Sequence, residues 1–116
     1  MVMTSWCGGD GKATRSFVYV EDAAEAILIV LSNGADGTAY NIDSGLAVTI
    51  SELAETVRNQ VNPTLNLVFD DSKPVGFPYR VGSIDSLASL GYTLAVGLEE
   101  GIAATVDWYQ KEVGSD

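Results

Sequence analysis

The segment AAEAILIVLSNG, residues 23–34, constrains the fold of this chain more than any other part of the sequence. Glu21 and Asp22 precede it, and Asn33 and Gly34 close it. This pattern is typical of a helix, because acidic residues suit the free amides of the first turn and glycine ends a helix. We therefore assign Asp22 to the helix start and not to catalysis. Apolar side chains surround most of this helix, so it needs cover on several sides. A chain of 116 residues can rarely supply that much cover.

Three short runs predict β-strands. Residues 17–20 (FVYV) are β-branched and aromatic, and residues 65–69 (LNLVF) alternate between apolar and polar. The third run extends from Ala39 to Ile42 and follows an Asp36–Gly37 turn. We expect these strands to be short.

Three further helices are expected. Thr49 and Glu52 fit a capping box, in which each side chain accepts a hydrogen bond from the other's free amide, and apolar residues follow at helical spacing up to Val61. Residues 83–92 predict a short helix closed by Gly91, and a terminal amphipathic helix begins near Leu98. Residues 1–116 therefore predict a single α/β domain, a small mixed lobe with about four helices and three short strands.

Charge and composition exclude several classes of function. The chain has 16 acidic residues, six basic residues and no histidine, for a net charge of −10, which argues against nucleic-acid binding. The single cysteine, Cys7, cannot form a disulfide within the chain, and without histidine a zinc site is not expected. No apolar run approaches the ~20 residues that span a bilayer, and no basic-then-apolar leader is present. We expect a cytoplasmic protein without a membrane partner.

The order of several motifs resembles a known family. The motifs are GDGKATRSFVYVEDAAEAI, YNIDSG, TISELAETV, DDSKP and LEEGIAATVDWY, spread from Gly9 to Tyr109. Together they resemble the C-terminal, substrate-binding part of extended short-chain dehydrogenases. The likeness is to the NAD-dependent epimerase/dehydratase family, and within it to nucleotide-sugar enzymes of the GDP-fucose synthase and GDP-mannose epimerase type. The resemblance implies a lobe that lacks the Rossmann nucleotide-binding sheet.

The catalytic signatures of that family do not occur in this sequence. The family binds NAD(P) through a glycine-rich loop between a strand and a helix, and it transfers protons with a Tyr-x-x-x-Lys pair. The glycines of CGGDGK do not lie between a predicted strand and a predicted helix, and no tyrosine stands four residues before a lysine. We therefore expect no cofactor to be bound by this chain alone, and we assign no catalytic residue.

Three basic residues are the candidate substrate-binding residues. The resemblance implies that Arg15 contacts the diphosphate of a nucleotide sugar, and that Lys73 and Arg80 belong to a loop that closes over the same ligand. Arginine suits this role because its planar fork can donate two hydrogen bonds to one phosphate. The alternative is that Arg15 only pairs with a surface carboxylate. The motif YNIDSG also has Asp43 where the family usually has glycine.

Two functions are consistent with these observations. The first is a free-standing substrate-binding lobe of a nucleotide-sugar enzyme, either a fragment or one part of a split enzyme, and inactive by itself. In a split enzyme, a separate Rossmann-domain chain would supply NAD(P) and the tyrosine. The alternative is a homodimeric interaction module with a vestigial ligand site. In the family, the helix from Asp22 to Leu31 and the strand from Ala39 to Ile42 lean on the nucleotide-binding sheet. Without that sheet both would be uncovered, and we expect a homodimer through one of them.

Overall fold

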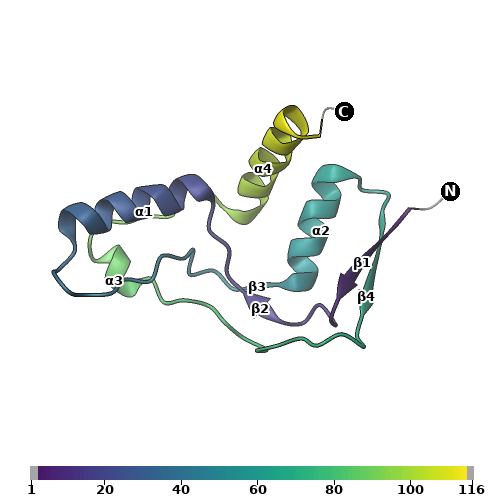
Figure 1. Ribbon diagram of the computed structural model, residues 1–116, viewed down its shortest axis with the longest axis horizontal. Coiled ribbons are helices and arrows are strands. Elements are labelled where there is room, and N and C mark those ends of the chain that lie inside the picture. The colour runs from purple at the N-terminus through teal and green to yellow at the C-terminus, as the bar shows by residue number, and fades with distance from the viewer. Residues whose placement is uncertain (1–2, 115–116) are drawn as a thin grey trace.

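The computed structural model describes residues 3–114, which form four helices and four strands (Figure 1). The strands are β1 (Thr4–Gly8), β2 (Thr14–Arg15), β3 (Val48–Thr49) and β4 (Asn66–Asp70). The helices are α1 (Val20–Asn33), α2 (Ile50–Val61), α3 (Asp85–Ala88) and α4 (Leu98–Glu112). The prediction of a small mixed α/β fold with four helices is confirmed, whereas the strands number four instead of three.

The strands form two separate two-stranded sheets. β1 and β4 are parallel, and their register runs from Thr4 opposite Asn66 to Gly8 opposite Asp70. β2 and β3 are antiparallel, with Arg15 opposite Val48. The strand predicted over residues 65–69 corresponds to β4, which begins one residue later, at Asn66. The other three strands were not predicted. The sequence of β1, TSWCG, does not alternate between apolar and polar residues. This strand forms because its backbone can pair with that of β4.

Two of the predicted strands are wrong. Residues 17–19 lead into α1 without forming a strand, and Val20 is already helical. The segment from Ala39 to Ile42 is also without strand structure, although Ile42 packs against the buried residues of the core. Both runs have suitable residues, but a strand needs a hydrogen-bonding neighbour, and the part of the chain described here provides none for them.

The helix boundaries agree closely with the local sequence signals. The capping box of α2 is present, because Thr49 Oγ1 accepts from the amide of Glu52 and Glu52 Oε2 accepts from the amide of Thr49, both at 3.1 Å. α1 ends at Asn33 with Gly34 as its C-cap, as predicted. α4 begins at Leu98 as predicted, and α3 is shorter than the expected helix over residues 83–92.

Asp22 lies in the first turn of α1, as predicted, but its carboxylate binds a distant segment of the chain. Its side chain is buried, and its two carboxylate oxygens accept from the backbone amides of Ala95 and Val96 at 3.3 and 2.9 Å. The N-cap of α1 is Tyr19, which makes no side-chain capping bond. The carboxylate thus fastens the segment before α4 to α1. The sequence could not show this, because the two partners lie more than seventy residues apart.

The buried core is small and lies under one face of α1. Ala26, Leu87 and Tyr92 form its centre, with Ile29 and Val30 packed against it. At the other end of the molecule, α2 and α4 lie side by side, with the β1–β4 pair beyond α2 (Figure 1). The Cα radius of gyration is 16.8 Å, against about 13 Å for a compact domain of this length. The described helices include none that is long and apolar enough to cross a membrane.

Candidate functional site

Arg15 and Arg80 line the same surface hollow, although they are far apart in the sequence. The hollow has a volume of about 360 Å³ and is also bordered by Ser16, Asn41, Ile42, Asp43 and Gly82. Of the three basic residues predicted to bind a ligand, the fold therefore brings two together.

Backbone pairing at Thr14 holds the two arginines next to each other. The Thr14 amide donates to the carbonyl of Pro78, and the Thr14 carbonyl accepts from the Arg80 amide, both at 2.9 Å. Arg15 follows Thr14 directly in β2, which is paired with β3 on its other side. The positions of the two arginine backbones are thus fixed by hydrogen bonds and not by their side chains.

The two guanidinium groups are oriented but not neutralised. Arg15 Nη1 donates to the Thr14 carbonyl at 2.8 Å, and the Arg80 guanidinium lies 4.5 Å from the centre of the Phe77 ring. A cation–π contact with a ring uses none of the N–H donors, and arginine has five of them. Over residues 3–114, the one ion pair within 4.0 Å joins Lys111 to Asp107. The simple alternative for Arg15, pairing with a surface carboxylate, is therefore not what the structure shows.

Asp43 ties together the segments that border the hollow. One carboxylate oxygen accepts from Ser16 Oγ at 2.6 Å and from the Gly82 amide at 2.7 Å, and the other accepts from the Ser44 amide at 2.6 Å. Gly82 has to be glycine at this close approach, since a Cβ there would lie 2.5 Å from the carboxylate.

These hydrogen bonds also determine the ionisation of Asp43. Burial alone would raise its pKa, but the bonds from Ser16 and from the amides of Gly82, Gly45 and Ser44 outweigh burial. The pKa of Asp43 is therefore lowered below its ordinary value of 3.8. Asp43 was not among the predicted site residues. Its signal in the sequence is Asp-Ser-Gly, which is typical of a turn in which the aspartate accepts from the following amides.

Lys73 lies outside this hollow. It is on the exposed loop of residues 71–80, where its amide donates to the Asp70 carbonyl at 3.2 Å. Its aliphatic carbons approach Gly8, because a Cβ placed on Gly8 would be 3.6 Å from them. The same loop carries both Lys73 and Arg80, but only Arg80 borders the hollow.

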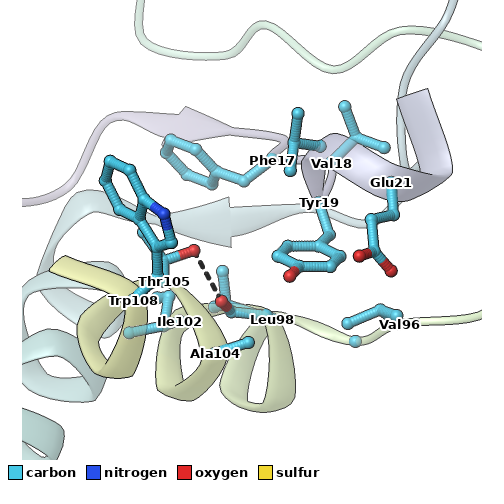
Figure 2. A pocket seen from close by; sticks show the side chains of 13 residues that line it. Phe17, Val18, Tyr19, Glu21, Val96, Leu98, Ile102, Ala104, Thr105 and Trp108 are labelled. Carbon is cyan, nitrogen blue, oxygen red and sulfur yellow. Dashed lines mark hydrogen bonds between the residues drawn. The ribbon is translucent and has the colours of Figure 1, made fainter. Parts of the chain in front are cut away.

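A second, larger hollow lies between residues 17–21 and the first turns of α4 (Figure 2). It has a volume of about 600 Å³, and its walls include Phe17, Tyr19 and Trp108, with Glu21 toward one end. Thr105 does not offer its hydroxyl to this space, because it donates to the Gly101 carbonyl at 2.8 Å. With mainly apolar walls, one carboxylate and no basic side chain, this hollow does not suit a phosphate.

The described residues provide no metal site, and one of their buried polar groups lacks a hydrogen-bond partner. Among residues 3–114, no group of three or more metal-ligating side chains is arranged to hold an ion. The hydroxyl of Tyr92 is buried and makes no hydrogen bond to the described residues. Burial, followed by the charges of Asp22 and Asp43, raises the pKa of Tyr92 above its ordinary 10.0.

Comparison with known sequences links this arrangement to one family. The family model described as "NAD dependent epimerase/dehydratase family" matches residues 5–43, a range that includes β2, Arg15 and Asp43. GDP-L-fucose synthase 1 of Arabidopsis thaliana is 41% identical over 105 residues, which are 90% of this chain and 32% of the plant protein. GDP-L-fucose synthase of Escherichia coli K12 is 34% identical over 110 residues, with 87% of this chain and 34% of the bacterial protein covered.

Solved structures show the same relationship. A GDP-L-fucose synthetase from Naegleria fowleri bound to NADP superposes with a TM-score of 0.89 at 27% identity. The match covers 97% of this chain and 36% of that structure. The chain thus spans about one third of the length of these relatives. Over about one third of their length, members of the NAD dependent epimerase/dehydratase family match this chain in both sequence and fold.

Proposed function

We propose that this chain is a substrate-binding lobe of a nucleotide-sugar enzyme, and that it binds the diphosphate of a nucleotide sugar through Arg15 and Arg80. The observation that carries the proposal is that both arginines border one hollow, with neither in an ion pair within the described residues. The similarity to GDP-L-fucose synthases supports this class of ligand.

The two arginines would act in different ways. Arg15 is held by its neighbour in β2 and uses one donor on the Thr14 carbonyl, which leaves other donors of its planar fork for phosphate oxygens. The Arg80 guanidinium lies over the Phe77 ring, and this contact restricts where the guanidinium lies without using its N–H donors, which remain for the ligand. Both groups are oriented before the ligand arrives, so less conformational entropy is lost on binding.

Electrostatics explains how an acidic chain would bind an anion at this place. The net charge of the chain is −10, yet the hollow has two guanidinium groups and a single carboxylate. The carboxylate is that of Asp43, and its oxygens already accept hydrogen bonds from Ser16 and from backbone amides. The hollow is therefore locally positive. The proposal concerns ligand binding alone, because the sequence contains no Tyr-x-x-x-Lys pair for proton transfer.

Calorimetric titration with GDP, UDP, GMP and GDP-mannose tests the proposal. We expect the diphosphates to bind more tightly than GMP, and Arg15→Ala to weaken their binding about 10- to 100-fold, which is the scale of a hydrogen bond to a charged group. Arg58→Ala is the matched control, because Arg58 is on α2 and its Nε donates to Asn59. Absence of binding at millimolar GDP, or equal binding by the Arg15→Ala protein, would contradict the proposal.

A further inference from the structure

Phe77 is an exposed aromatic residue that lies against one of the two arginines of the candidate site. Its ring centre is 4.5 Å from the Arg80 guanidinium, and the residue is 64% exposed. The guanidinium therefore covers only part of the ring. Single exposed apolar residues are common on protein surfaces, so exposure by itself does not indicate a ligand contact. Phe77 differs from a scattered surface residue in its position beside two cationic groups.

The backbone on both sides of Phe77 lies close to Arg15 and its strand. A Cβ placed on Gly76 would be 3.8 Å from Arg15 Nη2, so the Arg15 guanidinium reaches the residue that precedes Phe77. On the other side, the carbonyl of Pro78 accepts from the Thr14 amide at 2.9 Å. Phe77 thus lies between a residue that is near the Arg15 side chain and a residue that is bonded to the backbone next to it.

The same loop limits the conformations that Phe77 can adopt. Gly76 has a φ of 75°, which glycine adopts readily and other residues rarely do. Pro78 follows Phe77, and the residue before a proline is restricted to extended conformations. The ring is therefore presented by a constrained backbone, and less conformational entropy is lost when a ligand packs on it.

We propose that Phe77 stacks on the base of the nucleotide whose diphosphate Arg15 and Arg80 bind. This inference rests on the proposed function, because the arginines must hold the phosphates for the base to reach the ring. Every nucleobase has a flat π-face, so an aromatic side chain stacks on it with little dependence on which base is present. Phe77 would thus give a nucleotide higher affinity than inorganic pyrophosphate, with little preference between GDP and UDP.

The hexose of a nucleotide sugar is the alternative neighbour for Phe77. A hexose carries several hydroxyl groups, and these need hydrogen-bonding partners when they leave water. Asn41 borders the hollow and has a side-chain amide that can serve as such a partner, whereas the Phe77 side chain has no hydrogen-bonding atom. The base is therefore the part of the ligand that matches Phe77.

Calorimetric titration of Phe77→Leu with GDP, UDP and inorganic pyrophosphate tests the inference, because leucine is apolar but has no aromatic face. We expect the dissociation constants of GDP and UDP to rise about 10-fold, which is the scale of one stacked base. The dissociation constant of pyrophosphate should rise by less than about threefold, and Phe77→Tyr should bind all three ligands as the wild type does. Tyr109→Leu is the matched control, because Tyr109 on α4 is 55% exposed and borders neither of the two hollows described above.

Proton NMR separates stacking from an effect that acts through Arg80. An aromatic ring stacked on the base shifts the H8 proton of bound GDP upfield, so the wild type and Phe77→Tyr should show this shift and Phe77→Leu should not.

Three results would overturn the inference. The first is GDP binding that Phe77→Leu leaves unchanged, and the second is equal weakening of GDP and pyrophosphate binding, which would mean that Phe77 only holds Arg80 in place. The third is a loss seen with GDP-mannose and not with GDP, which would put the hexose on the ring. If the wild-type protein binds neither GDP nor pyrophosphate, the proposed function itself fails, and this inference fails with it.

Discussion

Replacing Asp43 should destabilise the fold and weaken the candidate ligand site together. Its carboxylate joins Ser16, the Ser44 amide and the Gly82 amide, which come from three separate segments of the chain. Two of these segments adjoin Arg15 and Arg80. In Asp43→Ala the three donors lose their acceptor at once. The variant therefore tests whether this residue organises the hollow.

The geometry gives an estimate of the effect on stability. Three hydrogen bonds to Asp43 are between 2.6 and 2.7 Å long, and a hydrogen bond to a charged group contributes about 1.5–3 kcal/mol when it is well buried. Asp43 is only partly buried, so water can replace part of what is lost. We expect a decrease of about 2–3 kcal/mol in the free energy of unfolding, or about 8–12 °C in Tm for a chain of this length.

The pH dependence of this stabilisation follows from the lowered pKa. A group whose pKa is lower in the folded state stabilises the fold above its unfolded pKa, and the stabilisation is lost as pH falls through the folded value. The ordinary value is 3.8, so the difference in stability between wild type and Asp43→Ala should be constant from pH 5 to 7 and should shrink below pH 3.8. Asp43→Asn should remove the same pH-dependent part while keeping one acceptor oxygen.

Urea unfolding followed by circular dichroism, at several pH values, measures these effects. Asp107→Ala is a suitable control, because Asp107 is 63% exposed and pairs only with Lys111 one turn away. Its removal should change the free energy of unfolding by less than about 0.5 kcal/mol. If Asp43→Ala unfolds no more easily than Asp107→Ala, or if the difference from wild type persists unchanged at pH 3, the assigned role of Asp43 is wrong.

Three further predictions follow from other parts of the structure. Asp22→Ala should lower the free energy of unfolding by about 2–3 kcal/mol, because the amides of Ala95 and Val96 lose a buried acceptor, and hydrogen exchange at these amides should become faster. Thr49→Ala should cost about 1 kcal/mol through loss of the α2 cap, measured by urea unfolding, and an unchanged midpoint would contradict the capping geometry. Titration of the 116-residue chain with NADPH, followed by fluorescence, should show no saturable binding at micromolar ligand, because the sequence has no dinucleotide-binding loop.

Signals within a few residues of each other determined the helices of this protein. Thr49 and Glu52 predict the start of α2 because both partners of the cap lie within one turn. Gly34 marks the end of α1, and apolar spacing from Leu98 predicts α4, for the same local reason. The sequence also indicated that α1 has more apolar surface than this chain covers, since that property depends only on which residues the helix contains.

Contacts between distant segments were decided by the tertiary structure alone. The runs at residues 17–20 and 39–42 have strand-forming residues, but they are not strands, because pairing depends on a neighbour and not on the run itself. Asp22 resembles a helix-start residue in the sequence, yet it holds a segment more than seventy residues away. The resemblance to a family selected Arg15, Lys73 and Arg80 as candidates, but only backbone pairing at Thr14 places Arg80 beside Arg15 and leaves Lys73 outside the hollow. Local patterns specify helices because their hydrogen bonds close within a turn, whereas a binding site is assembled by bonds between segments that the sequence keeps apart.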